Sequence, residues 1–390
     1  MKPDTEEAMA EAIRSANGPL CVEGGGTRGC AVAGDSLSIA ALSGITLYEP
    51  GALTVVAKAG TPVEEIDAAL AAEGQRLAFE PTDFRGLLDT SGTPTIGGVI
   101  ATNASGPRRI QGGAARDYAL GVRFVDGMGN IVKNGGRVMK NVTGYDLVKL
   151  MAGAHGTLGV LTEVALKVLP VAETQKTLIV HGSDELSAVQ TMSLSMRSPY
   201  EVSGAAHCAS ISKTGPITLL RVEGFEASVN YRIDALKKLL SDGGQEMTVA
   251  EGEMSLALWR SVRDASYMAD LEGDVWRVSC KPSDAAQLAE RSAARNRYFD
   301  WAGGLIWIRT DPGHDLRAAL GTFDGHATLV RADADTRARL PRFTPTAPGV
   351  ERITAGLRAR FDPRGILNTG LMGPTANKPS RAETTGEEAE

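Results

Sequence analysis

The sequence predicts an α+β protein with two domains. Its 390 residues exceed what one hydrophobic core usually organises. Over residues 1–170, short strand patterns alternate with glycine-rich stretches, whereas from residue 171 strands such as "KTLIV" and "ITLLRVEGF" alternate with amphipathic helices. We expect a first domain at 1–170 and a smaller α+β cap domain with an antiparallel sheet at 171–335. A C-terminal helix and turn should occupy 336–373, followed by a disordered polar tail at 374–390.

The elements of the first domain follow from local patterns. Residues 5–16 predict a helix and residues 20–23 a short strand that leads into a glycine-rich loop. "GITLYEP" and "ALTVVAKAG" predict two more strands. A second helix, "PVEEIDAALAAEG", should begin with Thr61 as N-cap and Pro62 in its first turn.

The rest of the chain is assigned in the same way. Residues 79–115 are dense in Gly, Pro, Thr and Ser and predict a long, loop-rich stretch that serves a function. "ALGVRFVDGMGNIVKNG" predicts a hairpin, "GYDLVKLMAGAHG" a short helix and "LGVLTEVALKVLP" a strand. Near the C-terminus, "ERITAGLRARFDP" predicts one more helix.

Composition and charge argue against several classes of protein. The net charge of −6 with mixed signs gives no electrostatic basis for binding nucleic acid. The four cysteines form no C-x-x-C pair, so we predict neither a zinc site nor an iron–sulfur cluster, and no metal site. The chain contains no apolar run of membrane-spanning length, and its charged N-terminus lacks the apolar stretch of a signal peptide. We therefore expect a cytoplasmic protein.

The first glycine-rich loop, "VEGGGTRGC", raises the question of a nucleotide site. Its spacing, Gly24-x-Gly26-x-x-Gly29, fits the dinucleotide fingerprint. An NAD site also needs a helix that begins at the loop, and Gly34-Asp35-Ser36 would break such a helix within two turns. A P-loop is excluded because no Gly-Lys-Ser/Thr follows. By itself, this run of glycines is also typical of a tight surface turn.

Two further glycine-rich stretches change that interpretation. They are "SGTPTIGGVIATNASG" at 91–106 and "GYDLVKLMAGAHGTLGVLTE" at 144–163. Glycines let backbone N–H groups approach an anion closely, and Thr and Asn side chains add donors. Three such stretches in one domain predict a ligand with a diphosphate in its middle.

The order of these motifs resembles a known family. "GGGT … TIGGVIATNASG … RD … KNVTGYDLVKLMAGAHGTLGVLTE" resembles the FAD-binding domain of the vanillyl-alcohol oxidase type, also called PCMH-type, which has two α/β subdomains. "FDPRGILNTG" resembles the closing motif of its 2-hydroxyacid dehydrogenase branch. "YEPGALTVVAKAGTPVEEIDAAL" and "GQRLAFEP" are most similar to FAD-binding subunits of bacterial glycolate oxidases. The match is strong over residues 20–170 and loose elsewhere.

The resemblance implies an FAD site and assigns residues to it. Some relatives tether FAD through a histidine in the first loop, but the matching residue here is Thr27, so we expect non-covalent FAD. Glu80-Pro81 and the following residues would run towards the flavin ring. The pyrophosphate would be held by Gly24, Gly25, Gly26 and Thr27. Both the pyrophosphate and the flavin side would be contacted by Thr95, Gly97, Gly98, Thr102, Asn103 and Gly106. The adenine and ribose would be contacted by Gly156, Thr157, Gly159, Val160 and Leu161.

The second domain departs from the branch. Self-sufficient members carry a motif H-x-G-D-G-N-x-H, whose histidines bind a metal or act as base, and this chain lacks it. The chemistry needs a base near the substrate hydroxyl and a cation for the carboxylate. His326 is a candidate base, and Arg277 and Lys281 are candidate carboxylate partners. Ordinary structural roles explain each of the three as well, so the catalytic residues stay open.

Three functions are consistent with this pattern. In the first, the chain is one flavoprotein subunit of a heteromeric glycolate oxidase that converts glycolate to glyoxylate. A larger FAD-containing subunit would hold the principal catalytic site, an iron–sulfur subunit would pass electrons to quinone, and any contact with the inner face of the membrane would come through these partners. The second is a free-standing FAD-dependent, D-lactate-like 2-hydroxyacid dehydrogenase, and the third is a non-catalytic assembly subunit. The missing histidine motif favours the first function over the second, and the intact glycine-rich loops argue against the third.

Overall fold

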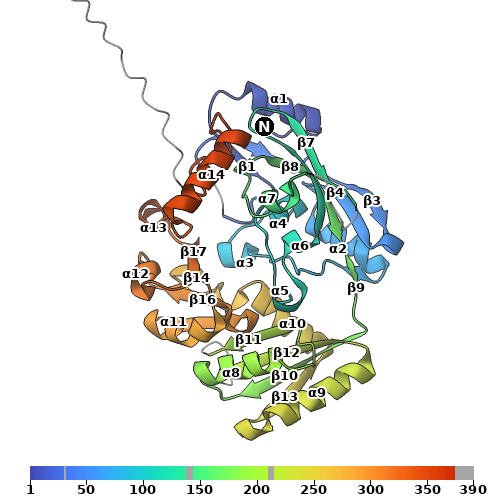
Figure 1. Cartoon of the computed structure of the whole chain (residues 1–390), viewed down its shortest axis with the longest axis vertical. Coiled ribbons are helices and arrows are strands. Elements are labelled where there is room, and N and C mark those ends of the chain that lie inside the picture. The colour runs from blue at the N-terminus through green and yellow to red at the C-terminus, as the bar shows by residue number, and fades with distance from the viewer. Residues whose placement is uncertain (30–31, 138–143, 210–214, 374–390) are drawn as a thin grey trace, which may run out of the picture.

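The structure, a computed structural model, describes residues 1–29, 32–137, 144–209 and 215–373. Figure 1 shows the N-terminal part with one sheet at the top and the cap with a second sheet below it. The helix α14 (Pro348–Phe361) lies along one side, next to the N-terminal part. The predicted tail at 374–390 and Cys30 lie outside the described residues.

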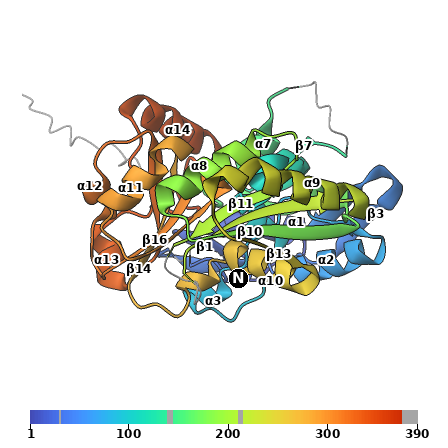
Figure 2. The same ribbon diagram turned by 90° about the horizontal axis from the view of Figure 1, so that it is seen from below.

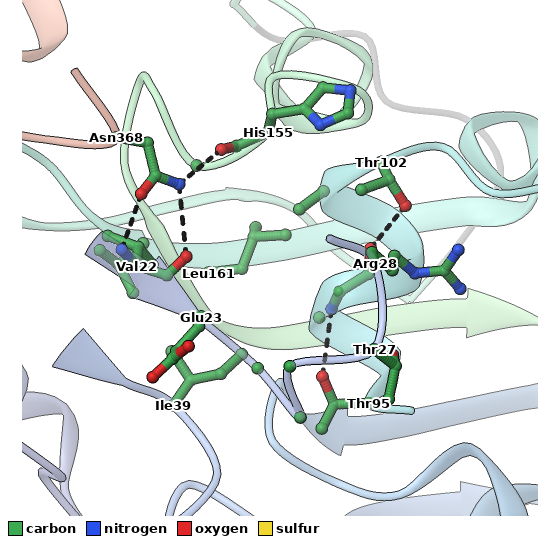
Figure 3. A pocket seen from close by; sticks show the side chains of 18 of the residues that line it. Val22, Glu23, Thr27, Arg28, Ile39, Thr95, Thr102, His155, Leu161 and Asn368 are labelled. Atoms are coloured by element: carbon green, nitrogen blue, oxygen red, sulfur yellow. Dashed lines mark hydrogen bonds between the residues drawn. The ribbon is translucent and has the colours of Figure 1, made fainter. Parts of the chain in front are cut away.

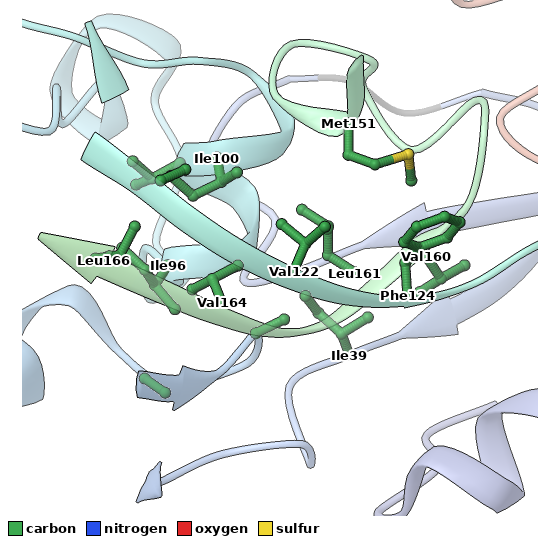
Figure 4. Packing of buried hydrophobic residues seen from close by; sticks show 14 of the residues in the cluster. Ile39, Ile96, Ile100, Val122, Phe124, Met151, Val160, Leu161, Val164 and Leu166 are labelled. Atoms are coloured by element: carbon green, nitrogen blue, oxygen red, sulfur yellow. The ribbon is translucent and has the colours of Figure 1, made fainter. Parts of the chain in front are cut away.

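A five-stranded antiparallel sheet forms the centre of the N-terminal part, in the order β3-β4-β8-β6-β7. The central strand β8 is buried at six of its eight positions, because the helix α4 and neighbouring elements cover it. Figure 4 shows Ile96 and Ile100 of α4 near Val164 and Leu166 of β8 in this core. The elements are α1 (Glu6–Ser15), β3 (Ile45–Glu49), β4 (Thr54–Lys58), α2 (Val63–Ala72), α4 (Ile96–Ala101), β6 (Ala119–Val125), β7 (Ile131–Gly135), α7 (Leu147–Met151) and β8 (Val160–Lys167).

A small parallel pair of strands leads to the first glycine-rich loop. It consists of β1 (Leu20–Glu23) and β2 (Asp35–Ser38). Leu20 also bridges in parallel to Leu367, so the C-terminal turn lies beside β1. A second pair, β5 (Gln75–Arg76) and β9 (Leu169–Pro170), is antiparallel.

One local expectation was wrong, and another was incomplete. Thr61 is not the N-cap of α2, since Pro62 takes that position without a side-chain cap. The Thr61 hydroxyl instead donates to the Lys58 carbonyl at 2.7 Å and accepts from the Gly44 amide at 2.9 Å. The loop-rich stretch at 79–115 also contains short helices that were not expected, namely α3 (Arg85–Leu88), α4, α5 (Arg109–Gly112) and the start of α6 (Ala115–Tyr118). Burial of α4 in the core offsets the low helix propensity of its glycines.

The cap contains an eight-stranded sheet, in the order β13-β10-β12-β11-β15-β16-β14-β17, in which every neighbouring pair of strands is antiparallel. The predicted antiparallel sheet is therefore present. Its strands are β10 (Thr174–His181), β11 (Gly204–Cys208), β12 (Ile217–Gly224), β13 (Met247–Glu251), β14 (Asp274–Cys280), β15 (Asn296–Asp300), β16 (Leu305–Thr310) and β17 (Gly325–Arg331).

Helices cover the two faces of the cap sheet unequally. The helices α8, α9 and α11 pack on one face and share its core (Figure 2). On the other face, α10 packs together with Leu87 of α3, so this face is turned towards the N-terminal part. The helices are α8 (Glu185–Met196), α9 (Glu226–Leu240), α10 (Gly252–Arg263), α11 (Ala285–Arg291), α12 (Leu316–Leu320) and α13 (Ala334–Arg339).

The two parts of the chain are joined by a buried network of ion pairs. Glu80 and Arg108 from the N-terminal part meet Arg221 and Glu223 from β12 of the cap. The domain boundaries at 170/171 and 335/336 stay a prediction. Among the described residues, no helix combines the length and the apolar character needed to cross a membrane.

Candidate functional site: a nucleotide pocket and an adjoining arginine-rich pocket

A pocket opens where the three glycine-rich stretches meet (Figure 3). It lies at the end of β1, beside α4 and next to the loop that precedes β8, and encloses about 980 Å³ of space free of protein atoms, part of it open to solvent. The lining comprises Cys21, Val22, Glu23, Gly24, Gly25, Gly26, Thr27, Arg28, Gly29, Ile39, Thr95, Gly97, Gly98, Ala101, Thr102, Met151, His155, Gly156, Gly159, Val160, Leu161 and Asn368.

The first glycine-rich loop packs backbone against backbone on the segment before α4. A Cβ on Gly25 would lie 1.6 Å from the carbonyl oxygen of Thr93, and one on Gly24 would lie 2.3 Å from the Thr95 hydroxyl. Gly26 has a φ of +69°, which disfavours other residues. The three glycines are therefore required for the shape of the loop.

The same loop offers backbone donors to the pocket. Within the described ranges, the N–H groups of Gly24, Gly25, Gly26 and Thr27 donate to no protein acceptor. Successive unpaired N–H groups in a turn form a concave site for an anion. This is the arrangement that a pyrophosphate requires, so the loop fits the central part of FAD.

The helix α4 contributes to the pocket in a different way. The amides of Ile96 and Gly97 donate to the carbonyls of Thr61 and Ala59 at 3.0 and 2.7 Å, and that of Gly98 donates to the Thr95 hydroxyl at 3.3 Å. These donors are already paired. Because a Cβ on Gly97 would lie 2.7 Å from Ala59, this glycine allows α4 to approach the sheet closely.

The third stretch is held in place by Asn368, from the C-terminal turn. The Asn368 amide accepts from the Val22 N–H at 2.7 Å and donates to the His155 carbonyl at 2.8 Å, as Figure 3 shows. Its exposed fraction is 3%. Asn368 thus ties β1 to the loop that contains Gly156, whose φ of +72° favours glycine.

The structure brings most of the predicted cofactor residues together. Twelve of the fifteen line this pocket, whereas Asn103 and Gly106 line the adjoining one and Thr157 lines neither, since its hydroxyl donates to the Ala154 carbonyl at 2.7 Å. Prediction missed Asn368 as a site residue, although "NTG" was part of a quoted motif. It also missed other lining residues, namely Glu23, Arg28, Met151 and His155.

A second pocket of about 930 Å³ continues from the first towards the cap and shares Arg28, Thr102 and His155 with it. Both parts of the chain contribute to its walls. Its other lining residues are Thr82, Phe84, Asn103, Ala104, Ser105, Gly106, Val262, Arg263, Arg277, Asp300, Leu305, Trp307, His326, Thr328, Val330, Arg342 and Phe343.

Two of the three catalytic candidates line the second pocket, and the third does not. Arg277 and His326 both line the second pocket. Lys281 lies outside the lining, where its exposed ammonium pairs with Asp324 at 2.6 Å. Thr82 and Phe84 line this pocket. The carboxylate of Glu80, which precedes them in the sequence, instead forms an ion pair with Arg221 of the cap.

Burial changes the protonation of several groups in the second pocket. Burial, assisted by nearby Glu80, raises the pKa of Asp300 to about 7, although the backbone N–H of Trp301 opposes this rise. Burial, with Arg109 close by, lowers the pKa of Arg277 to about 10. Burial also lowers the pKa of His155 to about 4, assisted by Arg342 and Arg28, so this imidazole is neutral at pH 7.

Comparison with known proteins shows to which family this chain is related. Residues 1–135 match the model of the FAD binding domain. The chain is 32% identical over 380 residues to the glycolate oxidase subunit GlcE of Escherichia coli, which covers 95% of this chain and 97% of that protein. It is 43% identical over 99 residues to the glycolate oxidase subunit GlcD of Bacillus subtilis, covering 25% of this chain and 21% of that protein.

Among solved structures, p-cresol methylhydroxylase with substrate bound shares the fold, with a TM-score of 0.71 at 12% identity and coverage of 97% of this chain and 89% of that one. These findings confirm the predicted PCMH-type fold, the FAD cofactor and the resemblance to a glycolate oxidase subunit. The chain belongs to the family of the glycolate oxidase subunit GlcE.

Proposed function

We propose that this chain is the FAD-binding subunit of a heteromeric glycolate oxidase, which converts glycolate to glyoxylate and passes electrons through flavin to partner subunits and then to quinone. Similarity to the Escherichia coli subunit over 95% of the chain supports this function. The observation that carries it is the set of four N–H groups in the first loop that donate to no described residue, in the lining of the pocket formed by the three motifs.

The proposed roles of the residues follow from the pocket. Gly24 to Thr27 hold the pyrophosphate through backbone N–H groups, and the shared lining at Thr102 leads towards the second pocket, where the flavin side would lie. Thr27 in place of a tethering histidine supports non-covalent FAD. FAD supplies the acceptor for a hydride, and the protein supplies binding, orientation and proton transfer.

The proposed partners are a larger FAD-containing subunit and an iron–sulfur subunit. The names of the relatives, GlcE and GlcD, support more than one subunit. We propose that the complex works on the cytoplasmic side of the membrane and that membrane contact is made by its partners.

The test is to purify the full chain alone and together with its two partners. We expect the chain alone to carry FAD that acid releases, and only the complex to sustain glycolate oxidation with a quinone acceptor. A chain without any flavin would contradict the FAD role and leave an assembly subunit. Steady turnover of glycolate or D-lactate by the chain alone would instead identify a free-standing dehydrogenase.

A further inference from the structure

The strand order of the cap sheet brings one carboxylate and one arginine to the second pocket. Arg277 of β14 is opposite Trp307 of β16, and Asp300 of β15 is opposite Leu305 of β16. Trp307 and Leu305 are two residues apart, and side chains alternate along a strand. All four side chains therefore share one face of the sheet, and all four line the pocket.

Arg277 has no anionic partner in the part of the chain that the structure describes. Its guanidinium makes no ion pair within 4.0 Å and no hydrogen bond with any described residue. It lies over the ring of Trp301, 4.7 Å from the ring centre, and Trp301 is anchored through its indole N–H to the Gly106 carbonyl at 3.2 Å. Arg277 is half-buried. A partly desolvated guanidinium without a partner is unfavourable unless a ligand supplies the anion.

The other pocket arginines differ from Arg277, because each of them donates to protein acceptors, although the Nε of Arg342 has no partner among the described residues. Arg263 pairs with Asp264 at 2.7 Å, and Arg342 donates to the Gly29 carbonyl at 3.0 Å. Arg28 donates to the Thr82 carbonyl at 2.9 Å. Arg277 is therefore the arginine of this lining best placed to hold a ligand carboxylate.

Among the described residues that line this pocket, Asp300 is the single carboxylate. One of its oxygens, Oδ1, accepts from the backbone N–H of Trp301 at 2.7 Å, which fixes the side chain. Its exposed fraction is only 3%. Asp300 and Arg277 make no ion pair within 4.0 Å of each other, and both line the same pocket.

We propose that Arg277 and Asp300 form a site for the 2-hydroxy acid on this chain, in which Arg277 holds the carboxylate and Asp300 accepts the hydroxyl proton. The inference rests on the proposed function, since it needs bound FAD as the hydride acceptor. The O–H proton moves to Asp300, the C–H bond breaks with transfer of its electron pair as hydride, and the C–O single bond becomes the carbonyl of a 2-oxo acid. Asp300 then releases the proton to solvent.

The pKa of Asp300 supports this role, because a base that titrates near the working pH combines an ionised form with useful proton affinity. The competing base is His326, which faces the same pocket from β17. Burial and the nearby Arg277 lower the pKa of His326 below its usual value, so the two bases predict different pH profiles.

The test uses the purified full chain with its FAD, and oxalate as a probe that binds without being oxidised. We expect Arg277→Met to weaken oxalate binding, measured by calorimetry, by at least about tenfold, and Arg277→Lys to weaken it less. Asp300→Asn should bind oxalate as well as the wild type or better, yet slow the anaerobic reduction of the flavin by glycolate by about 100-fold or more. In the wild type this rate should rise with pH up to about 7 and Asp300→Asn should lose that dependence.

Lys281→Met is the matched control, since it removes an exposed cation from the end of the same strand without touching the pocket. It should leave both measurements unchanged. Wild-type oxalate affinity in both Arg277 variants, or a wild-type rate and pH profile in Asp300→Asn, would overturn the proposal, as would a rate lost only in His326→Gln. If the chain carries FAD but neither binds oxalate nor has its flavin reduced by glycolate, only this inference is contradicted. If the chain carries no flavin, the proposed function is contradicted.

Discussion

Arg221 and Glu80 form a buried, two-point ion pair that links the cap to the FAD-binding part. The Nη1 and Nη2 atoms of Arg221 donate to the two carboxylate oxygens of Glu80 at 2.9 and 3.0 Å. The Glu80 carboxylate also accepts from the backbone N–H of Arg108 at 2.7 Å. The pair fixes one wall of the second pocket, because Gly106 packs directly on Glu80.

Removal of Glu80 should destabilise the protein strongly. Glu80→Ala leaves the fully buried Arg221 without its main partner, and loss of one member of a buried pair costs about 3–5 kcal/mol. Thermal unfolding should show a clearly lower midpoint. The control is Arg85→Ala, which breaks a more exposed pair with Asp83 and should cost less than about 1 kcal/mol. Equal effects of the two substitutions would contradict the importance of burial.

The same pair predicts sensitivity to acid. Burial opposes the ionisation of Glu80, but Arg221 and Arg108 outweigh burial and lower its pKa below the ordinary value of 4.5. A depressed pKa contributes stability that is present above the pKa of the unfolded chain and is lost as pH falls through the folded-state pKa. Unfolding midpoints measured from pH 6 downwards should therefore fall more steeply in the wild type than in Glu80→Gln.

Asp300 should make the opposite contribution. Its pKa of about 7 lies above that of an unfolded aspartate, about 3.9, so the folded state holds a proton that the unfolded state releases. The stability cost grows as pH rises from about 4 to about 7 and stays constant above that range. Asp300→Asn should raise the unfolding midpoint by several degrees at pH 8 and by little at pH 4. An unchanged midpoint at both values would contradict this expectation.

Asn368 should control FAD affinity although it lies 346 residues from its partner Val22. Asn368→Ala leaves the Val22 N–H without an acceptor and frees the His155 loop, at a cost of about 1–3 kcal/mol. The dissociation constant of FAD, followed by flavin fluorescence, should increase by about tenfold or more. The exposed Asn130, which bonds only within its own turn, provides the control in Asn130→Ala.

Gly25 should tolerate no side chain. The added methyl of Gly25→Ala would meet the Thr93 carbonyl oxygen, so one of the two loops must move and the pyrophosphate site is distorted. We expect purified protein with less than about a tenth of the wild-type FAD content. Gly86→Ala is the control because nothing lies within 4 Å of the added atom and a helical alanine is favoured by about 1 kcal/mol. Full FAD content in Gly25→Ala would refute the packing argument.

Local patterns predicted most of the elements correctly. The helix predicted at residues 5–16 from its helix-forming residues before Asn17-Gly18 is present, with Thr5 as its N-cap, and so is the hairpin at 119–135 predicted from its turn residues Asp126 to Gly129. The short helices within 79–115 were missed because glycine and threonine favour loops locally, while burial of α4 overrides that preference. The N-cap of α2 was misplaced for a similar reason, since the Thr61 hydroxyl finds tertiary partners at Gly44 and Lys58.

The sequence by itself determined the cofactor site in outline. The glycines could be interpreted from the sequence, because a residue without a Cβ permits a tight loop in any tertiary context. Only the tertiary structure placed Asn368 beside Val22 and put Arg277 and Asp300 on one face of the cap sheet. These relationships depend on the order and register of strands that are far apart in the chain, and a one-residue shift would turn either side chain to the opposite face.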